Sequence, residues 1–328
     1  MKKSLIALAA LAATGVVSAQ SSVTISGGLN VGYGSTAGVA SFSSNAGGGN
    51  HVTFTSSEDL GGGLRATASI NVRFNPTTGY NTGNGGAALP ATAGADGPNE
   101  FDAFAQNVTL GLSGPFGQIR LGRFTGVIQG PLGGYDPFGT DANGVGISPT
   151  HIVARGNGMI AYNTPTINGF TLSVQSTQKN NNTATDAATA ATKNGTEVAV
   201  TYGQGPLSLH FGNSNGLTGT KGNAFGASYN LGVAVPRIAH AKTETVAGVE
   251  TKETMVGVSV PMGAFTFKAG HKITEVSNVT TDVKRTAFGV TYALSKRTSM
   301  LADTHKETGN TTAATNKQAY YVGLRHTF

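Results

Sequence analysis

The segment that most resembles a catalytic motif is 212–216, which reads Gly-Asn-Ser-Asn-Gly and so matches the G-x-S-x-G nucleophile elbow. An elbow needs a strand before the serine and a helix after it, because this sharp turn is what exposes the hydroxyl. Here the motif lies at a polar hairpin tip, and no helical pattern follows it. We therefore expect no nucleophilic catalysis at Ser214.

Metal ligation and nucleotide binding have no supporting pattern either. The seven histidines show no metal-ligand spacing, the H-E-x-x-H motif is absent, and the chain contains no cysteine. No Walker A sequence occurs, and the glycines fall in turns or on strand faces rather than before a helix. We therefore expect no metal, no cofactor and no enzymatic activity.

Composition excludes several other classes of protein. Charged residues make up only 12% of the chain, which fits neither a disordered polyelectrolyte nor a solvated helical protein. The 48 glycines follow no G-X-Y period, which excludes collagen. The excess of basic residues, 22 against 16 acidic ones, is small and never clusters with aromatic side chains, so we expect no nucleic-acid partner.

The first nineteen residues have the pattern of a secretory signal peptide. Lys2 and Lys3 give a positive start, an apolar run follows at 5–17, and Val17-Ser18-Ala19 offers small side chains before a cleavage site. We expect cleavage between Ala19 and Gln20, which leaves 20–328 as the mature chain. The alternative is a lone N-terminal helix, since the run is too short to cross a bilayer as a helix.

The mature chain alternates with a period of two residues, which is typical of β-strands with two different faces. In the run 64–74 the even positions are apolar, whereas Arg65, Thr67, Ser69, Asn71 and Arg73 lie between them. Runs of the same kind continue to the end of the chain. No amphipathic helix competes with this pattern.

Short turns alternate with longer polar connections, which is the signature of an outer-membrane barrel. The longer connections include 35–50, 75–100, 125–156, 179–193 and 307–316. We predict an all-β fold, a 16-stranded antiparallel transmembrane β-barrel. The alternative is a soluble β-sandwich or solenoid, which also alternates. The sixteen strands are expected near 22–34, 50–58, 63–75, 101–113, 117–124, 157–163, 168–178, 194–203, 206–213, 222–231, 233–243, 252–261, 263–275, 282–293, 297–306 and 316–328.

A closed barrel explains both faces of these strands. Closure satisfies every backbone donor and acceptor without an edge in lipid, so the apolar face can point outward. The polar face then lines a wet lumen, where Arg65 and Arg73 are tolerated. Sixteen strands leave the lumen too wide for side chains to fill, so an aqueous channel is expected.

An ordered set of short motifs resembles the Gram-negative trimeric general porins of the neisserial and β-proteobacterial type. The set runs from residue 22 to residue 328, and its order is that of the family. It consists of Ser22-Val23-Thr24-Ile25-Ser26-Gly27, Ser57-Glu58-Asp59-Leu60-Gly61-Gly62-Gly63-Leu64-Arg65-Ala66, Leu110-Gly111-Leu112-Ser113-Gly114, Ile119-Arg120-Leu121-Gly122-Arg123, Tyr162-Asn163-Thr164-Pro165 with Gly169-Phe170, Leu294-Ser295-Lys296-Arg297-Thr298 and Val322-Gly323-Leu324-Arg325-His326-Thr327-Phe328.

The resemblance implies that 125–156 is an inserted third extracellular loop that narrows the lumen. The family's loop-end arginine corresponds to Arg155 and its second-strand arginine to His51. Its fourth-strand arginine corresponds to Gln106, and its third-strand acid to Asn71. The fit to the family's arginine ladder is therefore partial.

Other charged residues could belong to this constriction, or they could simply be solvated in the lumen. Arg73 and Arg120 take the lumen parity of their strands and could restore positive charge, whereas Arg65 lies near a periplasmic turn. Asp136 and Asp141 in the inserted loop would form a facing acidic wall, and a facing acid and arginine give a transverse field. Lys268 and Lys272 add inward charge further away. The plain alternative is that all of these are solvated lumen charges.

The resemblance implies an outer-membrane porin for passive diffusion of small hydrophilic solutes and inorganic anions, with a modest anion preference. Two alternatives stay open: a substrate-specific channel in which Tyr135 and Phe138 guide a ligand, and a structural or adhesive barrel without useful conductance.

The resemblance also implies partners. These are outer-membrane lipid, two further copies of the chain in a homotrimer, and the barrel-assembly machinery, which reads the terminal aromatic Phe328. Small outward positions at Gly27, Ala66 and Ala68 would let neighbouring barrels approach closely.

Overall fold

The computed structural model describes residues 21–36, 38–43, 49–77, 106–139, 143–147, 152, 155–179, 193–309 and 317–328. Ala19 and Gln20 lie outside this set, so the expected signal cleavage has no structural counterpart in it. None of the helices in the described ranges is long and apolar enough to cross a membrane.

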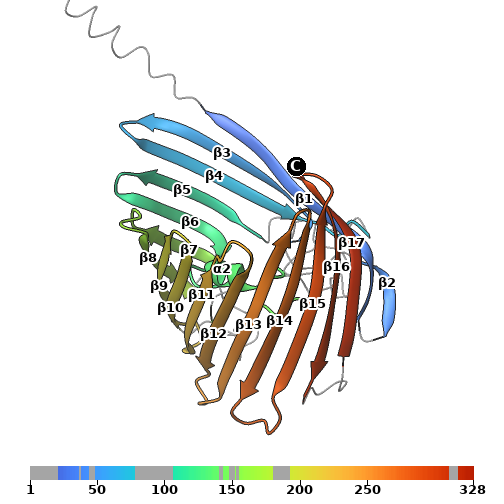
Figure 1. Ribbon diagram of the computed structural model, residues 1–328. Coiled ribbons are helices and arrows are strands. Elements are labelled where there is room, and N and C mark those ends of the chain that lie inside the picture. Colours follow the sequence, from blue (N-terminus) through green and yellow to red (C-terminus); the bar gives the residue numbers. More distant parts are fainter. Residues whose placement is uncertain are drawn as a thin grey trace, which may run out of the picture.

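The described residues form seventeen strands and two short helical turns (Figure 1). The helical turns are α2 (Gln129–Leu132) and η3 (Gly133–Tyr135). The strands are β1 (Ser22–Thr36), β2 (Val39–Ser43), β3 (His51–Gly61), β4 (Leu64–Arg73), β5 (Val108–Gly114), β6 (Gly117–Thr125), β7 (Arg155–Asn163), β8 (Phe170–Thr177), β9 (Gly195–Gln204), β10 (Leu207–Asn215), β11 (Lys221–Tyr229), β12 (Val235–Glu244), β13 (Glu250–Met262), β14 (Phe265–Val276), β15 (Val283–Ala293), β16 (Thr298–Thr308) and β17 (Lys317–Thr327).

Neighbouring strands pair antiparallel, and β1 closes the sheet on β17, so the barrel is complete. The seventeen segments fill sixteen strand positions, because β2 and β3 share one. Residues 22–28 of β1 pair with β3, whereas residues 32–36 pair with β2. The prediction of sixteen antiparallel strands is confirmed.

The expectation that 35–50 is only a connecting loop is wrong, since it contains β2. This strand continues the β1 hairpin beyond β3. The Tyr33 and Phe42 rings meet edge-on across the hairpin, with centroids 5.5 Å apart. An aromatic cross-strand pair of this kind stabilises the pairing of β2 with the last residues of β1.

The last residue closes the seam between the ends of the chain. The Phe328 N–H donates to the Gly27 carbonyl at 3.1 Å, and the Gly27 N–H donates to the Phe328 carbonyl at 3.0 Å. A Cβ on Gly27 would lie 2.5 Å from the Phe328 ring. Gly27 is therefore covered by the terminal ring, and it is not the free outward position that we expected for contact with another barrel.

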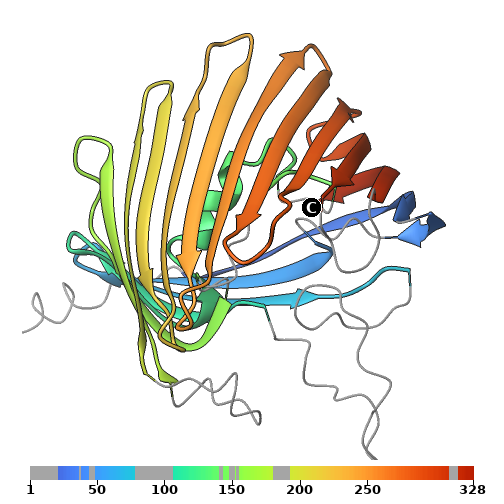
Figure 2. The same cartoon turned by 90° about the horizontal axis from the view of Figure 1, so that it is seen from below.

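The main cluster of buried apolar side chains lies inside the barrel, against β7 to β15, rather than between sheets. Most of its large members come from the end of β6 and the segment that follows, and they include Phe124, Ile128, Leu132, Tyr135 and Phe138. Figure 2 shows α2 enclosed by the strands.

Glycines on the inner wall make room for this segment. A Cβ on any of them would lie within 2.9 Å of a side chain from the loop, far closer than real contacts allow. These glycine and loop pairs are Gly212 with Ile128, Gly226 with Tyr135, Gly257 with Pro137, Gly270 with Val145 and Gly289 with Phe138. Together with buried alanines on the same wall, they form a seat into which the apolar loop fits.

Candidate pore-lining site

Arg73 and His51 lie opposite each other where β4 ends and β3 begins, on the lumen face. The His51 Nδ1 atom is 2.7 Å from the Gly49 carbonyl, and a Cβ on Gly49 would be 3.0 Å from the Arg73 guanidinium. The Nε of Arg73 is buried and has no hydrogen-bond partner among the described residues. The Arg73 charge therefore has no acid to neutralise it in the described part of this corner.

Arg155 begins β7, directly after the inserted segment. Its Nε donates to the Asn107 side-chain oxygen at 3.3 Å, and its Nη2 donates to the Thr125 hydroxyl at 3.5 Å. The positive charges of Arg73 and Arg123 act on it. Three guanidinium groups therefore share one region, which is unfavourable for the protein alone and favourable for a passing anion.

Arg123 is the member of this group that sequence reasoning missed. Simple alternation puts it on the opposite face from Arg120. The ladder between β6 and β7, however, shifts its register between Gly122 and Phe124. The Arg123 Nη1 donates to the Asn157 side-chain oxygen. Two glycines with positive φ mark the irregular stretch, Gly122 at +120° on β6 and Gly158 at +56° on β7, and glycines at these positions are the sequence signal for the bulge.

Arg120 and Arg65 have different places in the lumen. The Arg120 guanidinium lies over the Phe124 ring, 4.0 Å from its centroid, and so sits against the start of the inserted segment. Arg65 lies eight residues from Arg73 along β4, about 26 Å in an extended strand. Its Nη1 donates to the Ser57 hydroxyl at 3.0 Å beside the periplasmic turn. The structure does not bring Arg65 to the other arginines.

Asp136 is only 4% exposed and serves the loop itself. Its Oδ1 accepts the Phe138 N–H and its Oδ2 accepts the Gly146 N–H, both at 3.0 Å. The carboxylate therefore ties two stretches of the inserted segment together. It does not stand on the lumen surface as the acidic wall that we expected. Asp141, the other acid of that expectation, lies outside the described residues.

Tyr135 and Phe138, the candidate ligand guides, are buried as well. The Tyr135 hydroxyl is 3.1 Å from the Ser208 hydroxyl on the wall. Burial raises the pKa of the Tyr135 phenol above its ordinary value, and the contact with Ser208 lowers it by less. The phenol therefore stays neutral at ordinary pH and fastens η3 to β10. Neither ring offers a free face to a solute.

Lys268 and Lys272, expected as inward charges away from the narrowest zone, lie on the inner face of β14, and each is paired with an acid. The Lys268 Nζ lies 3.1 Å from an Asp303 carboxylate oxygen and 4.9 Å from the Phe138 ring centroid. The Lys272 Nζ lies 3.2 Å from a Glu253 oxygen and 3.3 Å from the Gly146 carbonyl. Glu253 lies on the neighbouring strand β13 and Asp303 lies on β16, two strands away. Both lysines are therefore neutralised by acids of the wall, and both hold the loop.

Two further wall residues anchor the loop in the same way. The Arg285 Nε donates to a Glu307 oxygen at 2.8 Å, and its Nη1 donates to the Gly144 carbonyl at 3.3 Å. The His305 Nδ1 is 3.1 Å from the Asn143 side-chain oxygen. Sequence reasoning missed both residues, although the apolar positions at 288, 290 and 292 imply that Arg285 faces inward.

The site therefore has two unlike sides. On the β4, β6 and β7 side, Arg73, Arg120 and Arg155 contact neutral groups in the described structure. On the β13 to β16 side, cations are matched by acids. Among the described residues, no three His, Cys, Asp or Glu side chains gather as metal ligands would. The arrangement can attract an anion to one side of a wet passage.

Three features define the class of protein: a closed barrel of sixteen strand positions, a loop packed inside it, and an uneven distribution of charge on the inner wall. They are the features of an outer-membrane channel. A model of the Gram-negative porin family matches residues 5–312. The chain belongs to this family, and it is an outer-membrane porin.

Two curated relatives extend over nearly the whole chain. Outer membrane porin protein 32 of Delftia acidovorans is 31% identical over 361 residues, which cover 99% of this chain and 93% of the relative. An outer membrane porin protein of Bordetella pertussis is 27% identical over 402 residues, covering both chains completely.

Solved structures share the fold. The anion-selective porin from Comamonas acidovorans superposes with a TM-score of 0.76 at 24% identity and covers 94% of this chain and 100% of its own. OmpF from Salmonella typhi gives a TM-score of 0.69 at 13% identity over 93% of this chain and 97% of its own. The barrel thus persists where little sequence is shared.

Proposed function

We propose that this porin passes small hydrophilic solutes and inorganic ions by passive diffusion, with a modest preference for anions. The observation that carries the proposal is the unequal neutralisation of charge in the lumen. Arg73, Arg120 and Arg155 contact neutral groups in the described structure, whereas Lys268 and Lys272 are paired with acids. An excess of fixed positive charge lowers the barrier for anions and raises it for cations.

We propose further that the inserted segment, 125–156, sets the width of the passage. Its apolar residues pack on the inner glycines, and Asn143, Gly144 and Gly146 are bonded to the wall. The described parts of the segment, held at these points, form a fixed obstacle rather than a mobile lid. The Comamonas structure, described as an anion-selective porin, supports a channel of this type by analogy of fold.

Single-channel recording in planar bilayers tests the proposal. A large ohmic conductance, with a reversal potential in a KCl gradient on the anion side, is the expected result. A silent barrel would overturn the channel proposal. A reversal potential on the cation side would overturn only the anion preference.

Three further points belong to the same proposal. Residues 1–19 are removed during export, the barrel-assembly machinery inserts the chain into outer-membrane lipid, and three copies associate. The chain acts as a channel and not as an enzyme. Each point rests on the sequence patterns and on family membership.

A further inference from the structure

Arg155 lies on β7, but the side-chain oxygen that its Nε atom binds belongs to Asn107, which directly precedes β5. The ladders show how far apart the two residues are. Val108 of β5 pairs with Arg123 of β6, and Thr125 of β6 pairs with Arg155. The strand β6 therefore lies between them. Because neighbouring strands are about 4.8 Å apart, the Arg155 side chain must stretch across the full width of β6.

This stretched position is unfavourable unless something holds it. The charges of Arg73 and Arg123 act on Arg155 and repel it, and a long side chain loses much rotamer freedom when it is fixed. The Thr125 hydroxyl accepts from the Nη2 atom at 3.5 Å, and the Asn107 oxygen accepts from the Nε atom at 3.3 Å. The Asn107 oxygen is the nearer acceptor, and it lies beyond β6 from Arg155. It is therefore the contact that keeps the side chain extended.

Asn107 can serve as an anchor because its own backbone is fixed. Its carbonyl accepts the Asn71 N–H at 2.8 Å, and the next residue, Val108, pairs with Ile70 on β4 as well as with β6. Asn71 is held in turn, since its side-chain amide donates to the Thr53 hydroxyl at 2.6 Å. The anchor thus belongs to the hydrogen-bonded wall of the barrel and not to the inserted segment.

The chemical type of the anchor matters as much as its place. An amide oxygen accepts a hydrogen bond without cancelling the charge of the donor, whereas a carboxylate would form an ion pair. Neither Arg73 nor Arg155 has an ion pair within the described part of the chain. On the other side of the lumen, the Asp303 carboxylate holds Lys268 at 3.1 Å. The wall therefore holds Arg155 in place at full charge, and it holds Lys268 as half of a neutral pair.

We propose that Asn107 is a positioning residue for the anion preference. Its side-chain oxygen keeps the Arg155 guanidinium extended across β6 in the region of Arg73, and its neutrality leaves both charges available to a passing anion. Asn107 acts through Arg155 and needs no contact with the solute. The inference rests on the proposed function, because it identifies a residue on which the anion preference of that channel depends.

Asn107→Ala tests the positioning role, because it removes the acceptor and changes no charge. Once released, Arg155 should move away from Arg73. The reversal potential in a dilute KCl gradient should then shift toward cation preference, by less than in Arg155→Gln. In an Arg155→Gln background the same change should have no further effect, since the residue that Asn107 positions is absent. A reversal potential does not depend on the number of channels, so poor folding of a variant would not imitate this result.

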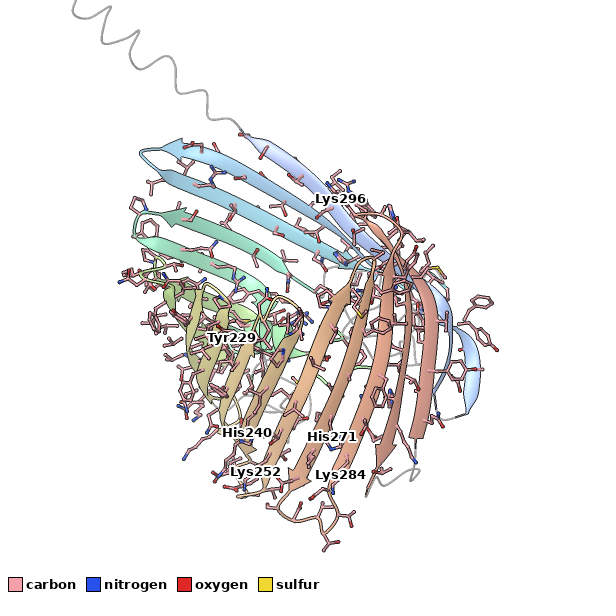
Figure 3. The ribbon with its side chains drawn as sticks, in the orientation of Figure 1. Tyr229, His240, Lys252, His271, Lys284 and Lys296 are labelled. Carbon is pink, nitrogen blue, oxygen red and sulfur yellow. The ribbon has the colours of Figure 1, made fainter. Side chains whose placement is uncertain are left out.

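Asn107→Asp tests the neutrality of the anchor. The carboxylate has nearly the shape of the amide and can still hold Arg155, but it neutralises the charge. The shift toward cation preference should be at least as large as in Arg155→Gln. Asn163→Asp is the matched control, since it adds the same charge on β7 eight residues from Arg155, roughly 25 Å along an extended strand. Lys284→Gln controls for the loss of a positive charge outside the lumen, because Lys284 is an exposed lysine at the start of β15 (Figure 3). Both controls should shift the reversal potential much less.

Three results would overturn the inference. They are the parent reversal potential in Asn107→Ala, an equal effect of Asn107→Ala with and without Arg155, and equal shifts for Asn107→Asp and either control. A parent porin that conducts without anion preference would overturn that preference and this inference together. An anion-selective parent with an unmoved Asn107→Ala variant would overturn this inference alone, so the two failures are distinguishable.

Discussion

Arg155 and Arg65 carry the same charge in the same lumen, but their neighbours give them different roles. The charges of Arg73 and Arg123 add to that of Arg155, whereas Arg65 lies beside Ser57 and opposite Asp59 in the ladder, near the periplasmic end. Two unit charges 4 Å apart interact by about 1 kcal/mol at the dielectric of water and by about 4 kcal/mol at an effective value of 20. The effective dielectric of a confined, wet passage lies between these limits. One arginine of the Arg73, Arg123 and Arg155 group can therefore change the energy of a passing ion substantially.

Replacing Arg155 with Gln should therefore shift the reversal potential toward cation preference at 0.1 M salt, by several-fold in the permeability ratio, since about 1.4 kcal/mol is tenfold. At 1 M salt the Debye length is about 3 Å and most of the shift should vanish. Arg65→Gln is the control and should do much less. Equal shifts for the two variants would mean that the lumen field is diffuse.

The buried ion pair of Lys268 and Asp303 should contribute to the stability of the barrel rather than to ion selectivity. Lys268→Met leaves the Asp303 carboxylate uncompensated beside Phe138, which should cost about 3–5 kcal/mol of stability. The double variant Lys268→Met with Asp303→Leu removes both charges and should recover much of the loss. The measurement is thermal unfolding of the barrel in detergent. If the two single losses simply add in the double variant, the pair does not interact as the geometry indicates.

At the scale of the elements, the strands were predictable and the seat for the loop was not. Alternation in a stretch such as 64–74 reports the two environments of one strand, and that information is local. The fit of Gly226 to Tyr135 depends on residues far apart in the sequence, and an inward glycine looks the same whether it meets a loop or water. The pairing of Lys268 with Asp303 likewise depends on the register of three strands, β14, β15 and β16. This register cannot be read from a single sequence.

Gly226→Ala should test the seat. The added Cβ would lie 2.4 Å from the Tyr135 ring, so η3 must shift and the contact with Ser208 must weaken. Overpacking of this kind costs typically about 1–3 kcal/mol. We expect lower thermal stability and a single-channel conductance that differs from the parent value. Gly203→Ala is the matched control, because nothing lies within 4 Å of a Cβ at that inward position of β9. Parent behaviour in both variants would argue against a loop seated on this wall.

At the scale of the whole molecule, the outward faces of β1 and β4 decide whether barrels can associate. Gly27 is filled by the Phe328 ring, which leaves Ala66 and Ala68 on β4 as the small outward side chains in this region. Small residues let neighbouring walls approach closely. We therefore expect the close contact of the homotrimer at β4 rather than at Gly27.

Ala68→Arg should break the trimer into monomers, because it places a long cation where two barrels meet. Ala227→Arg on β11 is the control, since it puts the same charge on a lipid-facing position away from β4. Arginine on the lipid face costs up to about 2–4 kcal/mol in either place, so only association should distinguish the two variants. Native mass and unheated gel mobility measure it. Trimers in both variants, or monomers in both, would contradict a contact at β4.

Closure of the barrel concerns the whole chain, and it depends on the last residue. Phe328 contributes two backbone hydrogen bonds to Gly27 and a ring that covers that glycine. Phe328→Ala keeps the backbone bonds and removes the ring, whereas deletion of Phe328 removes both. We expect insertion into the outer membrane to fall for Phe328→Ala and to fall further for the deletion. Thr327→Ala keeps the ring and the Thr327 N–H bond to the Arg297 carbonyl, so it should insert normally. Surface levels by quantitative labelling measure the effect. Equal levels for Phe328→Ala and Thr327→Ala would show that the seam closes without the terminal aromatic ring.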